Sequence, residues 1–275
     1  MTRKGAARAP RPSPGHHVRP LCAPTGSHRP SAAACPTLET TGPIWGFPVP
    51  ADTVTPRHTR GQERVITGNR QASWAFADAY AAEDEALRWA RDRAREAGLR
   101  SVSPSAGATL RLLAAAVDAK AVAEIGTGTG VSGIHLLHGM RPDGVLTTVD
   151  TEPEHQQSAR QAFRAAGFAG NRARFIPGPA LDVLPRLADA GYDLVFCDGD
   201  RLEFPEYLTE SLRLLRPGGL VVFAGVFANG RTVGSGPQPT EVLRLRELLR
   251  IVRESDEVMP SLLPVGDGLL CAVRR

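Results

Sequence analysis

The sequence has few cysteines and no long uncharged run. Only four of its 275 residues are cysteine, and no two of them form a CxxC pair, so neither a zinc knuckle nor a dithiol redox motif is present. No stretch without a charged side chain reaches the roughly 20 residues that a membrane-spanning helix needs; the apolar run Pro217–Gly230, for example, has 14 residues. The N-terminus also lacks the continuous apolar core of a secretory signal. We therefore expect no membrane partner, and free thiols in a reducing, cytoplasmic compartment.

Positive charge is scarce outside the first sixty residues. Residues 1–60 carry a balance of +6, whereas residues 61–275 hold 25 basic and 27 acidic side chains, a balance of −2. A dedicated nucleic-acid-binding protein needs a basic face on its folded body. The mildly acidic body therefore predicts that nucleic acid is not a partner.

Residues 1–60 show little periodic hydrophobicity. They contain 11 of the 23 prolines and four of the seven histidines, and the histidines lack the spacing of metal ligands. A Pro/Arg-rich segment of this kind cannot bury enough apolar surface to offset the entropy of ordering it, so we expect it to be disordered. Two interpretations stay open: a native tail, or translated upstream sequence that precedes a true start near Val65.

From residue 69 to residue 275 helical and strand patterns follow one another. Apolar residues recur at helical spacing over 71–97, Gly98 supplies a stop, and Ser103-Pro104 opens a second helix that extends to 117. Short apolar strands then alternate with amphipathic helices. The expected strands are 121–125, 145–149, 174–176, 193–197, 220–223 and a closing pair around Gly266–Gly268; the expected helices are 131–140, 154–166, 180–188, 204–215 and 241–252.

This alternation predicts an α/β fold. Strands that alternate with helices form a doubly wound, mainly parallel sheet, here of seven strands, with helices on both faces. The closing strand–turn–strand predicts one antiparallel strand. In such sheets ligands bind beyond the carboxyl ends of the strands, so the residues that follow each strand are the candidates for a site.

A glycine-rich loop follows the first expected strand. It contains Gly126, Gly128 and Gly130, preceded by Glu124 and followed by Ser132. The GxGxG spacing differs from the GxGxxG of dinucleotide-binding loops, and no lysine follows as in a P-loop. Glycines let the backbone approach a ligand closely. An acid in front of the loop fits a ligand that carries an ammonium and a sulfonium better than a pyrophosphate; a tight structural turn is the alternative.

Acidic residues end two further strands. Asp150 follows the strand 145–149, about 20 residues after the glycine loop, where a carboxylate can accept hydrogen bonds from ribose hydroxyls; a helix N-terminal acid is the alternative. Asp198 and Asp200 follow the strand 193–197 and could face a ligand's amino group or an acceptor substrate. A solvated turn is the alternative for this pair.

These three strand ends, together with the segment Leu214–Leu220 (LLRPGGL), resemble the class I S-adenosylmethionine-dependent methyltransferases, which have a Rossmann-like fold. More narrowly, residues 70–275 are similar to the catechol O-methyltransferase-like family and its bacterial family 3 O-methyltransferases, including actinobacterial members. The resemblance implies S-adenosylmethionine as cofactor and O-methylation of a small-molecule acceptor. It also implies a helical lid over residues 69–117 and, as in many members, a homodimer.

The resemblance further implies roles for individual residues. Glu124 would contact the methionine part of the cofactor, Asp150 the ribose and Thr151 the adenine. Asp198 and Asp200 would lie at the methyl-transfer end, where they are candidate catalytic bases. The full set of expected cofactor-contacting residues is Val102, Glu124, Gly126, Thr127, Gly128, Ser132, Asp150, Thr151, Ala180, Asp198 and Asp200.

The chain departs from the family at the metal. Catechol-type members hold a divalent ion with an Asp after the fourth strand, which Asp198 matches, and with an Asp-Asn pair after the fifth. Here Ala224 and Gly225 stand in place of that pair, and one carboxylate is a poor anchor for magnesium. We therefore predict no tightly bound catalytic metal.

Two other functions stay open, and the histidines do not favour either. The first is an S-adenosylmethionine-binding protein without transferase activity, which loss of the metal pair would permit. The second is a nicotinamide-dependent oxidoreductase, which the GxGxG spacing disfavours. His135, His138 and His155 lie on expected helices rather than at strand ends, so we expect structural roles for them.

Overall fold

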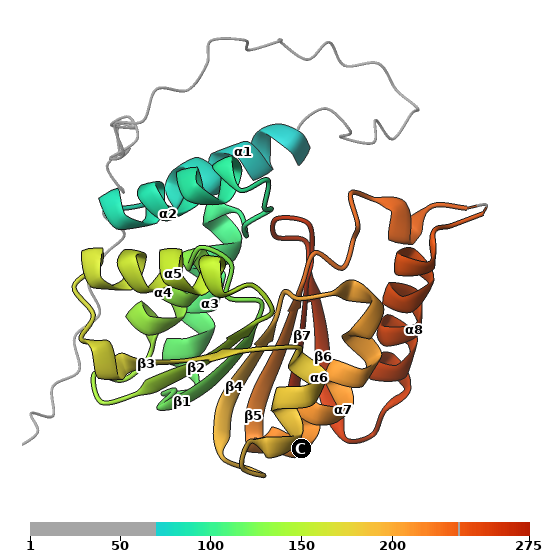
Figure 1. The fold of residues 1–275 in the computed structure, drawn as a ribbon. Helices are drawn as coiled ribbons and strands as arrows, with labels where there is room; N and C mark the ends of the chain where they lie inside the picture. The colour runs from blue at the N-terminus through green and yellow to red at the C-terminus, as the bar shows by residue number, and fades with distance from the viewer. Residues whose placement is uncertain (1–69, 236) are drawn as a thin grey trace, which may run out of the picture. The chain divides into compact units, whose positions relative to one another are not determined.

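One sheet of seven strands forms the centre of the computed structural model, which describes residues 70–235 and 237–275 (Figure 1). The predicted disordered segment 1–60 lies outside the described residues. The strands lie in the order β3-β2-β1-β4-β5-β7-β6, and β7 runs antiparallel to both of its neighbours. The prediction of a doubly wound, mainly parallel sheet with one antiparallel strand is confirmed. The strands are β1 (Ala121–Ile125), β2 (Val145–Asp150), β3 (Ala173–Pro177), β4 (Tyr192–Cys197), β5 (Leu215–Ala224), β6 (Val258–Leu263) and β7 (Leu269–Arg274).

Helices cover both faces of this sheet (Figure 1). The buried residues of α2 to α5 pack on one face, and those of α6, α7 and α8 pack on the other. The strand side chains alternate accordingly: in β4, Phe196 faces the first group, whereas Val195 and Cys197 face the second. The helices are α1 (Arg70–Tyr80), α2 (Glu85–Glu96), α3 (Pro104–Ala116), α4 (Val131–Gly139), α5 (Pro153–Ala165), α6 (Ala180–Val183), α7 (Phe204–Leu214) and α8 (Thr240–Glu254).

The prediction of one helix over 71–97 is wrong. The helical conformation is interrupted between Tyr80 and Glu85. There the Asp84 carboxylate accepts a 2.8 Å hydrogen bond from the Leu87 N–H and caps α2. The prediction of a helix over 180–188 is also too long. Helix α6 ends at Val183 and a 3-10 turn follows, because Pro185 has no N–H to continue the helical bonding.

The order of the strands places the sequence motifs side by side. β1 lies between β2 and β4, so that Ile125 pairs in register with Val149 on one side and with Cys197 on the other. The glycine loop, Asp150 and Asp198 directly follow these three residues. They therefore meet at the point where the strand order reverses, which is where ligands bind in open α/β sheets.

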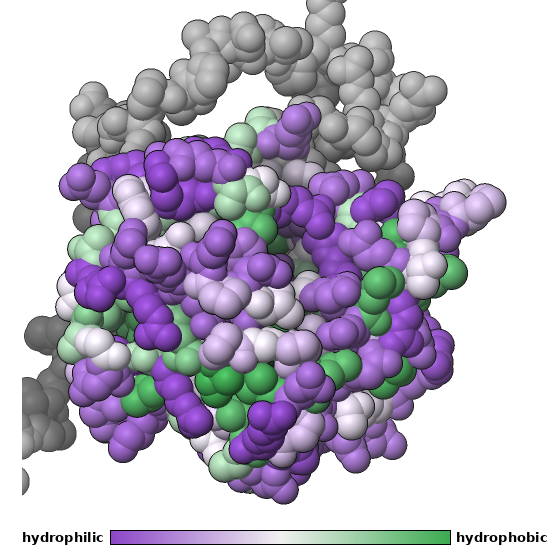
Figure 2. Space-filling model, in the orientation of Figure 1, coloured by the Kyte–Doolittle hydropathy of each residue, from purple (hydrophilic) through white to green (hydrophobic). Residues whose placement is uncertain are grey.

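The described surface is largely hydrophilic. Figure 2 shows polar residues over most of the visible face, with hydrophobic residues in small groups. Trp74, Phe76 and Tyr80 of α1 are among the exposed large hydrophobic side chains. Within residues 70–235 and 237–275, no helix combines the length and the apolar character needed to cross a bilayer.

Candidate active site

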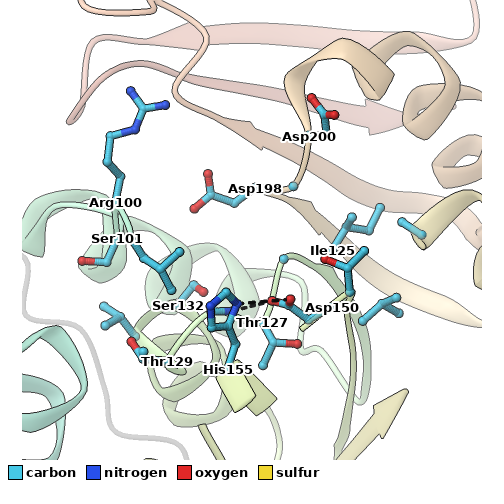
Figure 3. Close-up of a pocket in the computed structure, with 18 of the residues that line it drawn as sticks. Arg100, Ser101, Ile125, Thr127, Thr129, Ser132, Asp150, His155, Asp198 and Asp200 are labelled. Atoms are coloured by element: carbon cyan, nitrogen blue, oxygen red, sulfur yellow. Dashed lines mark hydrogen bonds and ion pairs between the residues drawn. The ribbon is translucent and has the colours of Figure 1, made fainter. Parts of the chain in front are cut away.

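A cavity of about 390 Å³ opens at the carboxyl ends of β1, β2 and β4 (Figure 3). Ten of the eleven predicted cofactor-contacting residues line it, and the exception is Glu124. The ten come from five separate segments of the chain, which the topology alone brings together. They are Val102, Gly126, Thr127, Gly128, Ser132, Asp150, Thr151, Ala180, Asp198 and Asp200.

The glycine loop passes very close to the end of β4. Gly126 has φ +94°, and a Cβ at this position would lie 2.7 Å from the backbone oxygen of Asp198. Both its conformation and its surroundings therefore require glycine. Gly130 begins α4 in the left-handed conformation with φ +96°. The loop thus turns sharply between β1 and α4 and exposes backbone to the cavity.

Glu124 lies beneath the cavity rather than in its wall. The side chain is fully buried, and its two oxygens accept 2.6 Å hydrogen bonds from the hydroxyls of Ser132 and Thr148. Burial raises the pKa of Glu124 to about 7, with help from the charges of Asp198 and Asp150 and against the two hydroxyl donors. Ser132 therefore connects this carboxyl group with the cavity, since it contacts both.

Asp150 lines the cavity at the end of β2. Its Oδ2 accepts a 2.8 Å hydrogen bond from the Gly128 N–H and its Oδ1 accepts one of 2.9 Å from the Glu152 N–H. His155 Nδ1 lies 3.4 Å from the same Oδ1 (Figure 3). The two interpretations of the sequence are thus compatible, because Asp150 ties the loop to the start of α5 and also faces the cavity.

Asp198 and Asp200 differ in their surroundings. The Asp198 carboxylate points into the cavity (Figure 3), and burial raises its pKa to about 7 against the nearby charges of Arg201 and Arg100. Asp200 is exposed, and its Oδ1 accepts a 2.9 Å hydrogen bond from the Leu202 N–H, which caps the following 3-10 turn. The two acids predicted together are therefore not equivalent.

The residues at the end of β5 do not fit a divalent metal. A Cβ on Gly225 would lie 2.1 Å from Nη2 of Arg201, so the guanidinium fills the space into which a ligating side chain at this position would extend. Arg201 is held there by a 2.9 Å hydrogen bond to Glu241 Oε1 and by Asp267 Oδ2 at 3.5 Å. A cation would meet this fixed positive charge, and we derive no chemical step through a metal.

Arg100, Ser101 and His155 are among the residues of the cavity wall that were not found from the sequence. Arg100 and Ser101 lie in the connection between α2 and α3, and His155 lies on α5. None of them ends a strand, and nothing in the local pattern marks them. The connection is held by Arg91, which donates hydrogen bonds of 2.9 Å to Ser101 Oγ and 2.7 Å to the Val102 carbonyl.

The fold and this site define a class of protein. A doubly wound sheet with a glycine loop after β1 and an acid at the end of β2 is the arrangement that binds an adenosine-containing ligand at the switch point. The comparisons narrow the class. Residues 82–275 match the model of the O-methyltransferase family, and the chain belongs to this family.

Known relatives support the same assignment. A Mycobacterium tuberculosis protein named "Probable O-methyltransferase" is 48% identical over 220 residues, which are 80% of this chain and 98% of the relative. The O-methyltransferase TomG from Streptomyces achromogenes, crystallised with S-adenosylmethionine, has 33% identity and a TM-score of 0.68 over 74% of this chain and 98% of its own. An O-methyltransferase from Bacillus cereus in complex with S-adenosylhomocysteine has 26% identity and a TM-score of 0.67 over 74% and 99%.

The protein is therefore an S-adenosylmethionine-dependent O-methyltransferase. The predictions of the family, the activity and the cofactor are confirmed. The roles of individual residues, the lid and the absence of a metal are proposals.

Proposed function

We propose that this protein methylates a hydroxyl group of a small molecule without a metal, and that the donor lies along the ends of β1, β2 and β4. The observation that supports this placement is the convergence of ten predicted residues on one cavity. The adenosine would lie by Asp150, Thr151 and Ala180. The methionine part would lie over the glycine loop, with Ser132 and Val102 beside it.

The donor supplies an electrophilic methyl group on a sulfonium. When the acceptor oxygen attacks, an O–C bond forms and the S–C bond breaks, the bonding pair stays on sulfur, and the hydroxyl proton must leave. We propose Asp198 as the group that accepts this proton, because its carboxylate points into the cavity and its pKa of about 7 suits a general base at neutral pH. Asp200, whose carboxylate caps a turn, would line the mouth of the cavity.

Glu124 would act through charge rather than by contact with the acceptor. A cationic ligand above the glycine loop favours the ionised form of this buried carboxyl group. Ser132 donates to Glu124 Oε1, so its own oxygen remains available to accept a hydrogen bond from the ligand's ammonium. Binding of the donor would thus be coupled to loss of the Glu124 proton.

Three further proposals complete this function. Helices α1 to α3, within residues 69–117, would form the lid over the acceptor. A homodimer follows the family resemblance, and light scattering of the purified protein tests it. A cytoplasmic location follows from the sequence prediction of free thiols.

Two measurements test the function. Calorimetry with S-adenosylmethionine, S-adenosylhomocysteine and NAD should show binding of the first two only, and binding of NAD alone would contradict the placement of the donor. Formation of S-adenosylhomocysteine should then be followed across a panel of phenols with magnesium or with a chelator. Equal rates are expected, and strict magnesium dependence would refute the metal-free mechanism. Tight donor binding without turnover of any hydroxylated acceptor, phenols and hydroxylated acids alike, would indicate a binding protein instead.

A further inference from the structure

A second cavity adjoins the first one. It has a volume of about 560 Å³ and shares Arg100, Asp198, Gly199 and Asp200 with the donor cavity. Its other lining residues come from the turn after β4 and the start of α8. Because the two cavities meet at Asp198, an acceptor in the second cavity has direct access to the end of the donor cavity.

Two arginines and three acids line this second cavity, and the two arginines differ in how they are held. Arg201 is largely buried, with 12% of its side chain exposed, and Glu241 and Asp267 fix its position. These two contacts leave several of its five N–H donors available. Arg100 is exposed and, within the part of the chain that the structure describes, has no hydrogen-bond or ion-pair partner. Arg100 and Asp198 both line this cavity, and Figure 3 shows the Asp198 carboxylate directed toward the side of the pocket on which Arg100 lies.

Three acids line the second cavity, and the carboxylates of two of them already have hydrogen-bond partners. Glu241 accepts from Arg201 and lies 3.6 Å from Arg231, and Asp200 caps its turn. Only the carboxyl group of Asp198 faces the cavity without a hydrogen-bond partner among the described residues. The cavity therefore offers one free carboxyl group next to the donor and two guanidinium groups around it.

We propose that the acceptor is a hydroxylated organic acid, whose carboxylate is held by Arg100 and Arg201 while its hydroxyl faces Asp198. This inference rests on the proposed function and specifies its substrate. Guanidinium groups bind carboxylates through paired, charge-assisted hydrogen bonds, which fix orientation as well as position. The acceptor is thus oriented by two arginines, in a site where Arg201 fills the space that a metal-binding side chain at position 225 would need.

The transfer then proceeds with all atoms accounted for. The acceptor hydroxyl gives its proton to Asp198, and its oxygen forms a bond to the methyl carbon as the S–C bond breaks. The products are a methyl ether that keeps its carboxylate, the neutral thioether of the donor, and a protonated Asp198 that returns its proton to water. The carboxylate takes no part in the bond changes and serves only for recognition.

The test compares acids with neutral analogues of the same shape. The probes are 3- and 4-hydroxybenzoate and 3,4-dihydroxybenzoate, each paired with its amide, and they are titrated into the full-length protein saturated with S-adenosylhomocysteine. We expect each acid that binds to do so roughly tenfold to a hundredfold more tightly than its amide. Methyl transfer from S-adenosylmethionine should show the same preference in kcat/KM.

Three variants locate the source of this preference. Arg100→Gln and Arg201→Gln should each bring the acid-to-amide ratio close to one, and affinity for S-adenosylhomocysteine is measured in parallel to confirm folding. Arg164→Gln removes an exposed arginine of α5 that lines neither cavity, and it should keep the ratio of the parent protein. Arg100→Gln keeps the test decisive even if loss of the Arg201 ion pairs unfolds the chain.

The outcomes separate this inference from the function on which it rests. Amides that bind and react as well as the acids, a ratio that survives Arg100→Gln, or binding of no acid in the panel would each overturn the inference. Neutral phenols that are methylated efficiently would do so while leaving the methyltransferase function intact. Failure to bind S-adenosylhomocysteine at all would overturn the proposed donor site first.

Discussion

At the ends of β1 and β2 the site consists of backbone and short side chains, whereas beyond β4 and β5 it consists of long charged side chains from distant segments. Gly126 and Asp150 lie within 25 residues of each other and follow adjacent strands. Arg100, Arg201 and Glu241 come from three parts of the chain more than 35 residues apart. The first region is therefore fixed by backbone geometry, whereas the second can be altered by changing side chains alone.

The largest effect should come from the closest backbone contact of the donor region. Gly126→Ala introduces a Cβ 2.7 Å from the Asp198 backbone oxygen at φ +94°, and we expect it to lower the free energy of unfolding by more than about 3 kcal/mol and to abolish donor binding. Gly128→Ala is the matched control for stability, since at φ +49° no atom lies within 4 Å of its Cβ; it should cost about 1 kcal/mol. Equal losses in urea unfolding would show that the contact is unimportant.

Arg91 is a positioning residue on α2, and substituting it tests how the connection between α2 and α3 is held against the cavity. The Arg91 guanidinium forms a largely buried ion pair with Glu83, whose pKa is about 2 because Arg91 and His135 outweigh the effect of burial. Arg91→Met leaves that largely buried carboxylate with His135 as its only cationic partner among the described residues, and should destabilise the fold by about 3 kcal/mol. It also releases the connection that contains Val102, so KM for the donor should rise more than kcat falls.

Two variants control this experiment. Arg91→Lys keeps the charge and should recover part of the stability but little of the donor affinity, because it cannot bond Glu83, Ser101 and Val102 together. Arg93→Met removes an exposed pair with Glu96 on the same helix and should change stability by at most about 1 kcal/mol. A fall in kcat alone, with KM unchanged, would contradict the positioning role of Arg91.

Asp150 tests the proposed ribose contact. Asp150→Ala should weaken binding of S-adenosylhomocysteine by about 1–3 kcal/mol, the range for a hydrogen bond to a charged group. Methylthioadenosine, which keeps the ribose but lacks the amino acid, should lose affinity by the same factor in calorimetry. If only S-adenosylhomocysteine were affected, Asp150 would act on the methionine part through the glycine loop rather than on the ribose.

The last prediction concerns pH and compares the melting temperature of the free protein with that of its complex with the donor. Burial raises the pKa of Glu124 from its usual 4.5, and that of Asp198 from its usual 3.8, to about 7. The contribution of these two groups to stability is therefore full below their ordinary pKa values and is lost as the pH rises through 7. The melting temperature of the free protein should therefore decline between pH 5 and 8. A cationic donor favours the ionised carboxylate, so the increase in melting temperature on adding S-adenosylmethionine should grow over the same range; an increase independent of pH would contradict this coupling.

Sequence patterns predicted where the glycine loop and Asp150 lie in the fold, because the requirements of these positions are local. The GxGxG loop after an apolar strand and the acid at the next strand end both fall within residues 121–150. Both lie at the strand ends where they were expected. The break between α1 and α2 was missed because the apolar spacing continues across it, although Asp84 is an ordinary capping residue. Arg201 could not be assigned, since its position depends on Gly225, Glu241 and Asp267, which meet only in the folded chain.

The most direct test of the whole account is a crystal structure of the protein with S-adenosylhomocysteine. We expect the ribose hydroxyls within hydrogen-bond distance of Asp150, the sulfur directed toward Asp198, and Arg201 still paired with Glu241. Electron density for the ligand anywhere else on the molecule, or a divalent ion bound to Asp198 with Arg201 displaced, would contradict the account.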